Sequence, residues 1–168
     1  MTQMTEPRDL FLHGLKDMYY AEKTIVKKLP GMIEEATDAE LMEGLRNHLE
    51  QTKGQVDNLE RVFEELGEEA QGEKCPGIEG LVVEHDEFVE KEQPTPQILD
   101  TFLTGAAARV EHYEIAAYRG LVESAKAMGE DSAARLLEQN LAQEHEALKL
   151  VESVGSRLVE TQAREVTA

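Results

Sequence analysis

The chain has 168 residues, enough for one domain with a sizeable core, and its 40% hydrophobic and 31% charged content excludes a disordered chain. Thirty-five acidic residues oppose seventeen basic ones, and the resulting formal charge of −18 disfavours nucleic acid and anionic membrane surfaces as partners. The single cysteine, Cys75, excludes an intramolecular disulfide. No apolar run reaches the length of a membrane span, and the polar N-terminus lacks a signal-peptide core, so we expect a cytoplasmic protein.

Apolar residues spaced three and four apart predict a first helix over residues 8–35 and a second over 38–66. Pro30 falls inside the first helical pattern, so we expect a kink or a break there. Thr37 is followed three residues later by Glu40, which is the pattern of a capping box at the start of a helix. The second helix is therefore expected to begin next to this pair.

A glycine-containing and proline-containing loop then leads to a shorter predicted helix over residues 77–91. Two further long helices are predicted over 97–128 and 131–160, separated by a connection that contains Gly129. The residues after 160 are expected to fray.

This order of elements predicts an all-α fold, with residues 1–168 as a single ferritin-like domain. Two long helices joined by a tight turn precede a long connection that contains its own short helix, and two more long helices follow. A four-helix bundle with one long crossover has this connectivity.

Four glutamates occupy positions on the apolar faces of three of the predicted long helices. Glu22, for example, has Leu15 and Met18 before it and Ile25 and Leu29 after it, at offsets that share one helix face. The same periodicity turns three further glutamates inward, so that the full set is Glu22, Glu111, Glu114 and Glu144.

Uncompensated carboxylates in a core are physically implausible, because each buried ion costs several kcal/mol and like charges repel. Protons or an inward basic residue could compensate in part, but the neighbouring lysines and arginines lie off these faces by helical rotation. These are Lys23, Arg109, Lys126 and Lys149. Two divalent cations would balance four carboxylates, and such ligands suit iron or manganese, so we expect one or two metal ions.

The second helix turns His48, Thr52 and Gln55 inward, whereas Glu50 lies almost opposite its apolar stripe and is rejected as a ligand. His48 could ligate a metal, or it could be a hydrogen-bonded core residue. Gln55 could bind a cation weakly through its side-chain oxygen. Both stay open as candidate ligands.

The remaining chemistry-bearing residues are weaker candidates. His112 and His145 each follow an inward glutamate by one residue, a rotation that favours hydrogen bonds between helices or to a ligand. His13 and His85 are expected to be structural or exposed. Cys75 has no basic neighbour to activate it, so we expect a partly buried free thiol.

The chain resembles the YciF-type family of bacterial ferritin-like stress proteins over nearly its whole length. The resemblance is carried by the segments "LKDMYYAEK", "NHLEQTKGQVDNLERVFEELG", "CPGIEGL" and above all "VEHYEIAAY". It implies a helical bundle that forms a homodimer, a role in bacterial stress response, and a metal site at the middle of the bundle. The implied ligands at matching positions are Glu22, Glu111, Glu114 and Glu144.

The chain also departs from the wider ferritin-like pattern, which uses Glu-x-x-His pairs. Ala147 stands where a pair beginning at Glu144 would place its histidine, and Thr52 and Gln55 replace the pair on the second helix. Three functions therefore stay open: a metal-binding protein, an oxidase or peroxide-consuming enzyme that uses the metals, and a non-enzymatic dimeric bundle with a metal-free site.

Overall fold

The computed structural model describes residues 4–166, which form five α-helices and, within that range, no strand. The all-α class is therefore confirmed. None of these helices combines the length and the apolar character that a membrane-spanning segment needs. The helices are α1 (Pro7–Glu35), α2 (Ala39–Glu65), α3 (Pro76–Glu92), α4 (Pro96–Met128) and α5 (Asp131–Val166).

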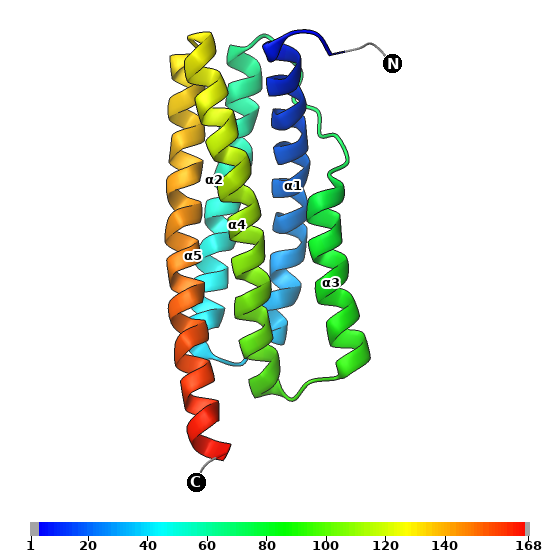
Figure 1. Ribbon diagram of the computed structural model, residues 1–168, viewed down its shortest axis with the longest axis vertical. Coiled ribbons are helices and arrows are strands. Elements are labelled where there is room, and N and C mark those ends of the chain that lie inside the picture. The colour runs from blue at the N-terminus through cyan, green and yellow to red at the C-terminus, as the bar shows by residue number, and fades with distance from the viewer. Residues whose placement is uncertain (1–3, 167–168) are drawn as a thin grey trace.

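Four long helices, α1, α2, α4 and α5, run along the long axis, and α3 lies outside them next to α1 (Figure 1). α1 and α2 are antiparallel, as are α4 and α5, whereas α2 and α4 point the same way (Figure 1). The chain must therefore return along the bundle between α2 and α4, and α3 makes that return. This is the predicted ferritin-like bundle with one long crossover that carries an additional helix.

The crossover helix α3 packs against both α4 and α1. The ring of Phe88 on α3 stacks on that of Phe102 on α4, with centroids 3.7 Å apart and planes 10° from parallel. On the other side, His85 Nε2 lies 2.9 Å from Glu35 Oε2 of α1. These contacts hold α3 over the junction between the first and the fourth helix.

The start of α2 differs from the prediction, because Asp38 rather than Thr37 is its N-cap. The Asp38 carboxylate accepts a hydrogen bond from the Leu41 N–H at 3.0 Å. Thr37 instead donates its N–H and its Oγ1 hydroxyl to Asp100 on α4, at 2.7 Å and 2.6 Å. The Thr37 side chain, which the local sequence pattern predicts to cap α2, is therefore bonded to Asp100, a residue distant in sequence.

A break at Pro30 and fraying after residue 160, both expected from the sequence, do not occur in the described residues. α1 continues through Pro30 to Glu35, because Pro30 is exposed and lies close to the end of the helix, where one lost backbone hydrogen bond costs little. α5 extends beyond residue 160 to Val166 rather than fraying. Near that end the Gln162 amide donates to the Gln97 carbonyl at 2.7 Å, which ties α5 to the start of α4.

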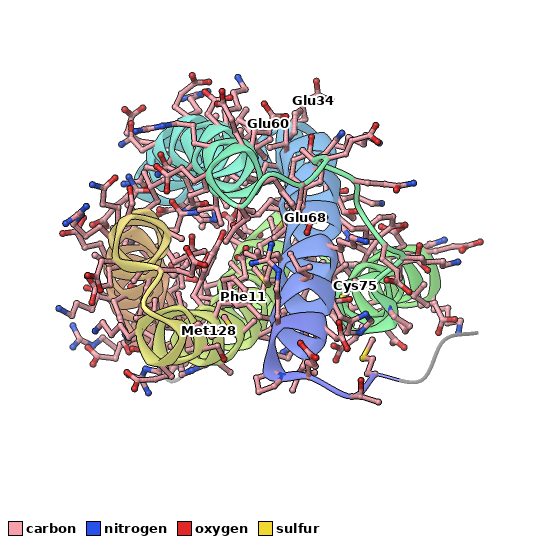
Figure 2. All side chains as sticks on the ribbon, turned by 90° about the horizontal axis from the view of Figure 1, so that it is seen from above. Phe11, Glu34, Glu60, Glu68, Cys75 and Met128 are labelled. Carbon is pink, nitrogen blue, oxygen red and sulfur yellow. The ribbon has the colours of Figure 1, made fainter. Side chains whose placement is uncertain are left out.

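The core lies along the axis of the bundle, and the charge lies outside it. Viewed down the long axis, Figure 2 shows nitrogen-tipped and oxygen-tipped side chains around the periphery, with Glu34 and Glu60 on the outer side of their helices. Phe11 points inward and is only 2% exposed. Acidic side chains that do lie inside the bundle are therefore exceptions that require a physical explanation.

Candidate metal centre

The four glutamates that the helical pattern turns inward are buried in the middle of the bundle. Glu22 on α1, Glu114 on α4 and Glu144 on α5 have no exposed surface, and Glu111 on α4 is 2% exposed. His48 and Gln55, which lie two turns apart on α2, also point into the bundle and are 7% and 0% exposed. The expected orientation of all six side chains is confirmed, while their binding of a metal stays a prediction.

Four of these side chains converge on a single point between α2, α4 and α5. His48, Glu111, Glu114 and Glu144 each place one potential ligand atom so that these atoms all lie within 4.8 Å of one another. Within this group, His48 Nε2 is 3.3 Å from Glu111 Oε1. The sequence did not decide whether His48 is a potential ligand or a structural core residue. The structure places His48 in the same group as the three carboxylates.

Glu22 stands at the edge of this group rather than within it. It reaches the cluster from α1, and its charge acts directly on Glu114 and Glu111. One of its oxygens, Oε1, accepts a hydrogen bond from the hydroxyl of Tyr118 on α4, and the other, Oε2, has no partner. Glu22 therefore lies beside the four-residue group, with one carboxylate oxygen unpaired.

Gln55 also contacts the cluster, through Glu144. Its Nε2 donates a hydrogen bond to Glu144 Oε1, and its own Oε1 is buried without a partner. Gln55 therefore orients one carboxylate and offers a further neutral oxygen. α2 contributes neutral groups to the site where α4 contributes two carboxylates.

The buried polar atoms that lack a hydrogen-bond partner gather at this site. Within the described residues, all such side-chain atoms belong to six residues, and both oxygens of Glu114 and both ring nitrogens of His48 are among them. Buried polar groups are normally paired, and an unpaired one costs about 1–3 kcal/mol. Unpartnered atoms on so many facing side chains form a site that could hold a further group, such as a metal ion. The six residues are Glu22, His48, Gln55, Glu111, Glu114 and Glu144.

Burial and mutual repulsion shift the ionisation of these groups. Burial raises the pKa of Glu22, Glu111 and Glu114 well above the ordinary glutamate value, and the nearby Glu144 raises it further. Burial lowers the pKa of the His48 imidazole, against the opposing charge of Glu144. Without a cation the folded chain therefore favours protonated carboxyl groups and a neutral imidazole, the form in which histidine ligates metals.

No basic side chain among the described residues compensates these carboxylates. The four lysines and arginines that helical rotation places off the inward faces are all exposed: Lys23, Arg109, Lys126 and Lys149. Glu50 is also outside the site, with its side chain 72% exposed and paired with Lys53. Its predicted position opposite the inward face is confirmed.

A layer of uncharged polar side chains supports the cluster from the α5 side. The buried Asn140 donates to the Tyr118 hydroxyl at 3.0 Å and accepts from Asn58 at 2.8 Å. Tyr118 in turn donates to Glu22. Sequence reasoning gave neither Tyr118 nor Asn140 a role at the site. The available signal was spacing, because Asn140 precedes Glu144 by four residues and Tyr118 follows Glu114 by four.

The other histidines and the cysteine lie away from the cluster. His145 makes the predicted hydrogen bond between helices, to Arg119 across the α4–α5 interface at 3.3 Å. His112 is exposed and lies 3.9 Å from Glu152, which is too far for a hydrogen bond. Cys75 is a free thiol, 1% exposed and thus more buried than expected, with Sγ 2.8 Å from the hydroxyl of Tyr113. None of the three belongs to the group of potential ligands.

The donor set fits a divalent transition metal. Carboxylate oxygens with one imidazole nitrogen are ligands that iron and manganese accept, and pairs of such ions occur in helical bundles. Ala147, beside Glu144, supplies no histidine, so the protein ligand set is smaller than two full Glu-x-x-His pairs would give. The group of His48, Glu111, Glu114 and Glu144 could hold a metal ion.

Comparison with known proteins places this arrangement in a family. Residues 6–164 match the family described as "Domain of unknown function (DUF892)". Over 137 residues the chain is 36% identical to Protein YciF of Escherichia coli strain K12, covering 81% of this chain and 82% of that protein.

Two solved structures extend the comparison. The structure of the E. coli stress protein YciF aligns with a TM-score of 0.88 and 32% identity over 94% of this chain and 99% of that one. YcfI from Rhodopseudomonas palustris aligns with a TM-score of 0.87 and 43% identity, covering 89% of this chain and 95% of that one. With family match, sequence identity and fold in agreement, the chain belongs to the DUF892 family of YciF-type, ferritin-like proteins.

Proposed function

We propose that the chain binds one or two iron or manganese ions at the centre of its bundle and serves in metal or oxidative-stress handling. The observation that carries this proposal is the gathering of unpartnered buried atoms on six facing side chains. Two divalent cations would balance the charge of the four carboxylates and replace the protons that the metal-free cluster holds.

The position of each residue suggests its role in metal binding. His48, Glu111, Glu114 and Glu144 surround one cation position. Glu22 supplies the additional carboxylate for a second ion. Tyr118 and Gln55 hold Glu22 and Glu144 in place through hydrogen bonds, which fixes the direction of their free oxygens.

Metal analysis of anaerobically purified protein, followed by calorimetric titration of Mn²⁺ and Fe²⁺ into chelated protein, tests the proposal. We expect one or two ions per chain, and an anomalous scattering peak among Glu111, Glu114 and Glu144. Glu114→Ala should lose this binding, whereas the exposed Glu50→Ala should retain it. If metal supplied at neutral pH gives no peak, the metal-binding proposal is wrong, and the alternative of a non-enzymatic bundle with a metal-free site is supported.

Metal binding should also stabilise the fold. Free metal at 100 times its dissociation constant adds about 2.7 kcal/mol to the free energy of unfolding. We therefore expect chelation to lower the melting temperature of the native protein but not that of Glu114→Ala.

An oxidase or peroxide-consuming activity is a second candidate, and a cavity that reaches His48 and Glu111 favours it. Bound iron or manganese would supply Lewis-acid and redox chemistry. The chain's own side chains would hold the metal and exclude bulk water from it. Oxygen or peroxide consumption that is the same in native protein and Glu114→Ala would argue against this activity.

The proposed stress-response role rests on similarity to the E. coli stress protein YciF. We also propose a homodimer, which the resemblance of the sequence to the YciF-type family implies. A host strain that lacks the gene should survive peroxide or metal stress less well, and Glu114→Ala should fail to restore survival. Light scattering should give twice the 18.8 kDa mass of one chain. A mass of one chain at micromolar concentration would exclude the homodimer.

A further inference from the structure

A cavity of about 300 Å³ lies beside the carboxylate cluster, inside the half of the bundle that α3 covers. All five helices contribute to its wall. Its lining includes the exposed residues Gly31, Asn47 and Glu146, so the cavity reaches the surface. Its volume lies at the lower end of the range of small-molecule pockets.

The wall of the cavity is mostly aliphatic, and small side chains create its space. Ala106 and Ala107 on α4 and Ala147 on α5 face the cavity from two adjacent helices. Ala147 lies three residues after Glu144, where a Glu-x-x-His pair would place an imidazole. An alanine at position 147 thus supplies no imidazole ligand to the site, and its small side chain also leaves space next to the site. The larger aliphatic wall residues include Ile25, Leu29, Val110, Leu150 and Val151.

The inner end of the cavity is polar. His48 and Glu111 both line it, and both are more than nine-tenths buried. Neither ring nitrogen of His48 nor Glu111 Oε2 has a hydrogen-bond partner. A molecule that fills the cavity would therefore meet aliphatic side chains along most of the wall and polar groups without partners at His48 and Glu111. The charged side chains Lys28, Asp86, His85 and Glu35 also line the cavity, but they pair with one another.

We propose that this cavity binds an aliphatic molecule with one terminal oxygen-donor head group, of which a medium-chain carboxylate is the simplest example. The hydrocarbon chain lies among the aliphatic wall residues, and the head group lies at His48 and Glu111. Binding of the head group rests on the proposed metal site, because the head group occupies the side of the cluster that Ala147 leaves without a ligand. The bound molecule is then the substrate or the resident ligand of that site.

Titration of octanoate into Mn²⁺-loaded protein tests this proposal. We expect saturable binding, and stronger paramagnetic relaxation of the carboxyl carbon than of the terminal methyl carbon, because the head group lies nearer the metal. Equal relaxation of the two carbons, or no binding to protein that does bind Mn²⁺, would overturn the cavity proposal and leave the metal site standing.

Variants that fill the cavity separate this site from surface binding. Ala106→Leu and Val110→Phe should each weaken octanoate binding at least tenfold while Mn²⁺ stoichiometry stays the same. Ala117→Leu, half-buried on the same helix and outside the cavity, is the matched control and should bind octanoate normally. Unchanged octanoate affinity in both filled variants, with circular dichroism showing a native fold, would place octanoate elsewhere.

Failure of Mn²⁺ and Fe²⁺ to bind would overturn the proposed function, and the cavity would still be testable by itself. In metal-free protein, 1-octanol should raise the melting temperature, since its chain fills the aliphatic part of the cavity and its hydroxyl can pair with the buried polar groups of His48 and Glu111. Val110→Phe should abolish that increase. An increase that Val110→Phe retains, or no increase at all, would refute the cavity as a site for aliphatic molecules.

Discussion

Gln55 on α2 donates a hydrogen bond from Nε2 to Glu144 Oε1 on α5, and both side chains are completely buried. The contact joins two helices at the level of the carboxylate cluster. A neutral amide at this point limits the repulsion that a further carboxylate would add. The choice of glutamine therefore lets the bundle tolerate its charge before a cation binds.

Gln55→Glu should make the protein depend more strongly on metal. The substitution replaces a hydrogen-bond donor by a further carboxylate, which should lower the free energy of unfolding of the metal-free protein by about 1–3 kcal/mol. With Mn²⁺ present the new carboxylate can act as a ligand, so the gap between loaded and chelated melting temperatures should widen. Calorimetric scans with Mn²⁺ or EDTA measure that gap.

The exposed Gln139→Glu on α5 adds the same charge outside the cluster and is the control for Gln55→Glu. It should leave both melting temperatures nearly unchanged. An equal gap in native protein and Gln55→Glu would show that no cation lies near Gln55.

The metal-free protein should lose stability as the pH rises from 5 to 8. The folded-state pKa values of Glu22, Glu111 and Glu114 lie above the ordinary 4.5. Their stabilising contribution is therefore complete below about pH 4.5 and is lost as the pH rises through the raised folded-state values. His48, whose folded-state pKa lies below 6.5, opposes this trend only as the pH falls below that value.

Urea unfolding in EDTA at several pH values measures this dependence. The double variant Glu22→Gln/Glu114→Gln should show a flatter pH profile and equal or higher stability at pH 8, because the amides need no proton to stay neutral. A profile as steep as that of the native protein would assign the pH dependence to the surface charge instead.

Tyr118→Phe should weaken both the fold and the metal site. The hydroxyl donates to Glu22 and accepts from Asn140, so its loss leaves two buried groups short of a partner. We expect a loss of about 1–3 kcal/mol in the free energy of unfolding. Metal affinity should fall roughly 10- to 100-fold, as for other residues that orient a ligand.

Tyr19→Phe is the matched control for Tyr118→Phe, because its hydroxyl donates to Glu60 at 2.7 Å, away from the cluster. It should reduce stability modestly and leave Mn²⁺ affinity unchanged in calorimetric titration. If both phenylalanine variants bind Mn²⁺ as tightly as native protein, Tyr118 has no role in orienting Glu22.

Asp100→Ala should destabilise the fold without affecting the metal. Asp100 is a buried carboxylate like those of the cluster, but it is paired with the N–H and hydroxyl of Thr37. We expect a loss of about 1–2 kcal/mol on urea unfolding and an unchanged Mn²⁺ stoichiometry. Thr37→Ala, which keeps the backbone contact, should lose less. Reduced Mn²⁺ stoichiometry in Asp100→Ala would contradict this prediction, because it would show that a buried carboxylate outside the cluster also affects metal binding.

Helical periodicity predicted the inward face of each long helix correctly, because that face depends only on residues within a few turns. Glu22 and Glu144 could be assigned to the interior from their apolar neighbours alone. Local patterns failed where a distant residue competes for the same group. Thr37 shows this, because its hydroxyl pairs with Asp100 on another helix instead of capping its own.

The sequence by itself therefore determined the helices, their order and the inward direction of the candidate ligands, since backbone geometry repeats every 3.6 residues whatever the helix packs against. Only the tertiary structure decided which inward groups meet. The axial offset between α2, α4 and α5 brings His48 level with Glu111, Glu114 and Glu144 and leaves Glu22 at the edge. That offset results from packing among many side chains, and no local stretch of sequence encodes it.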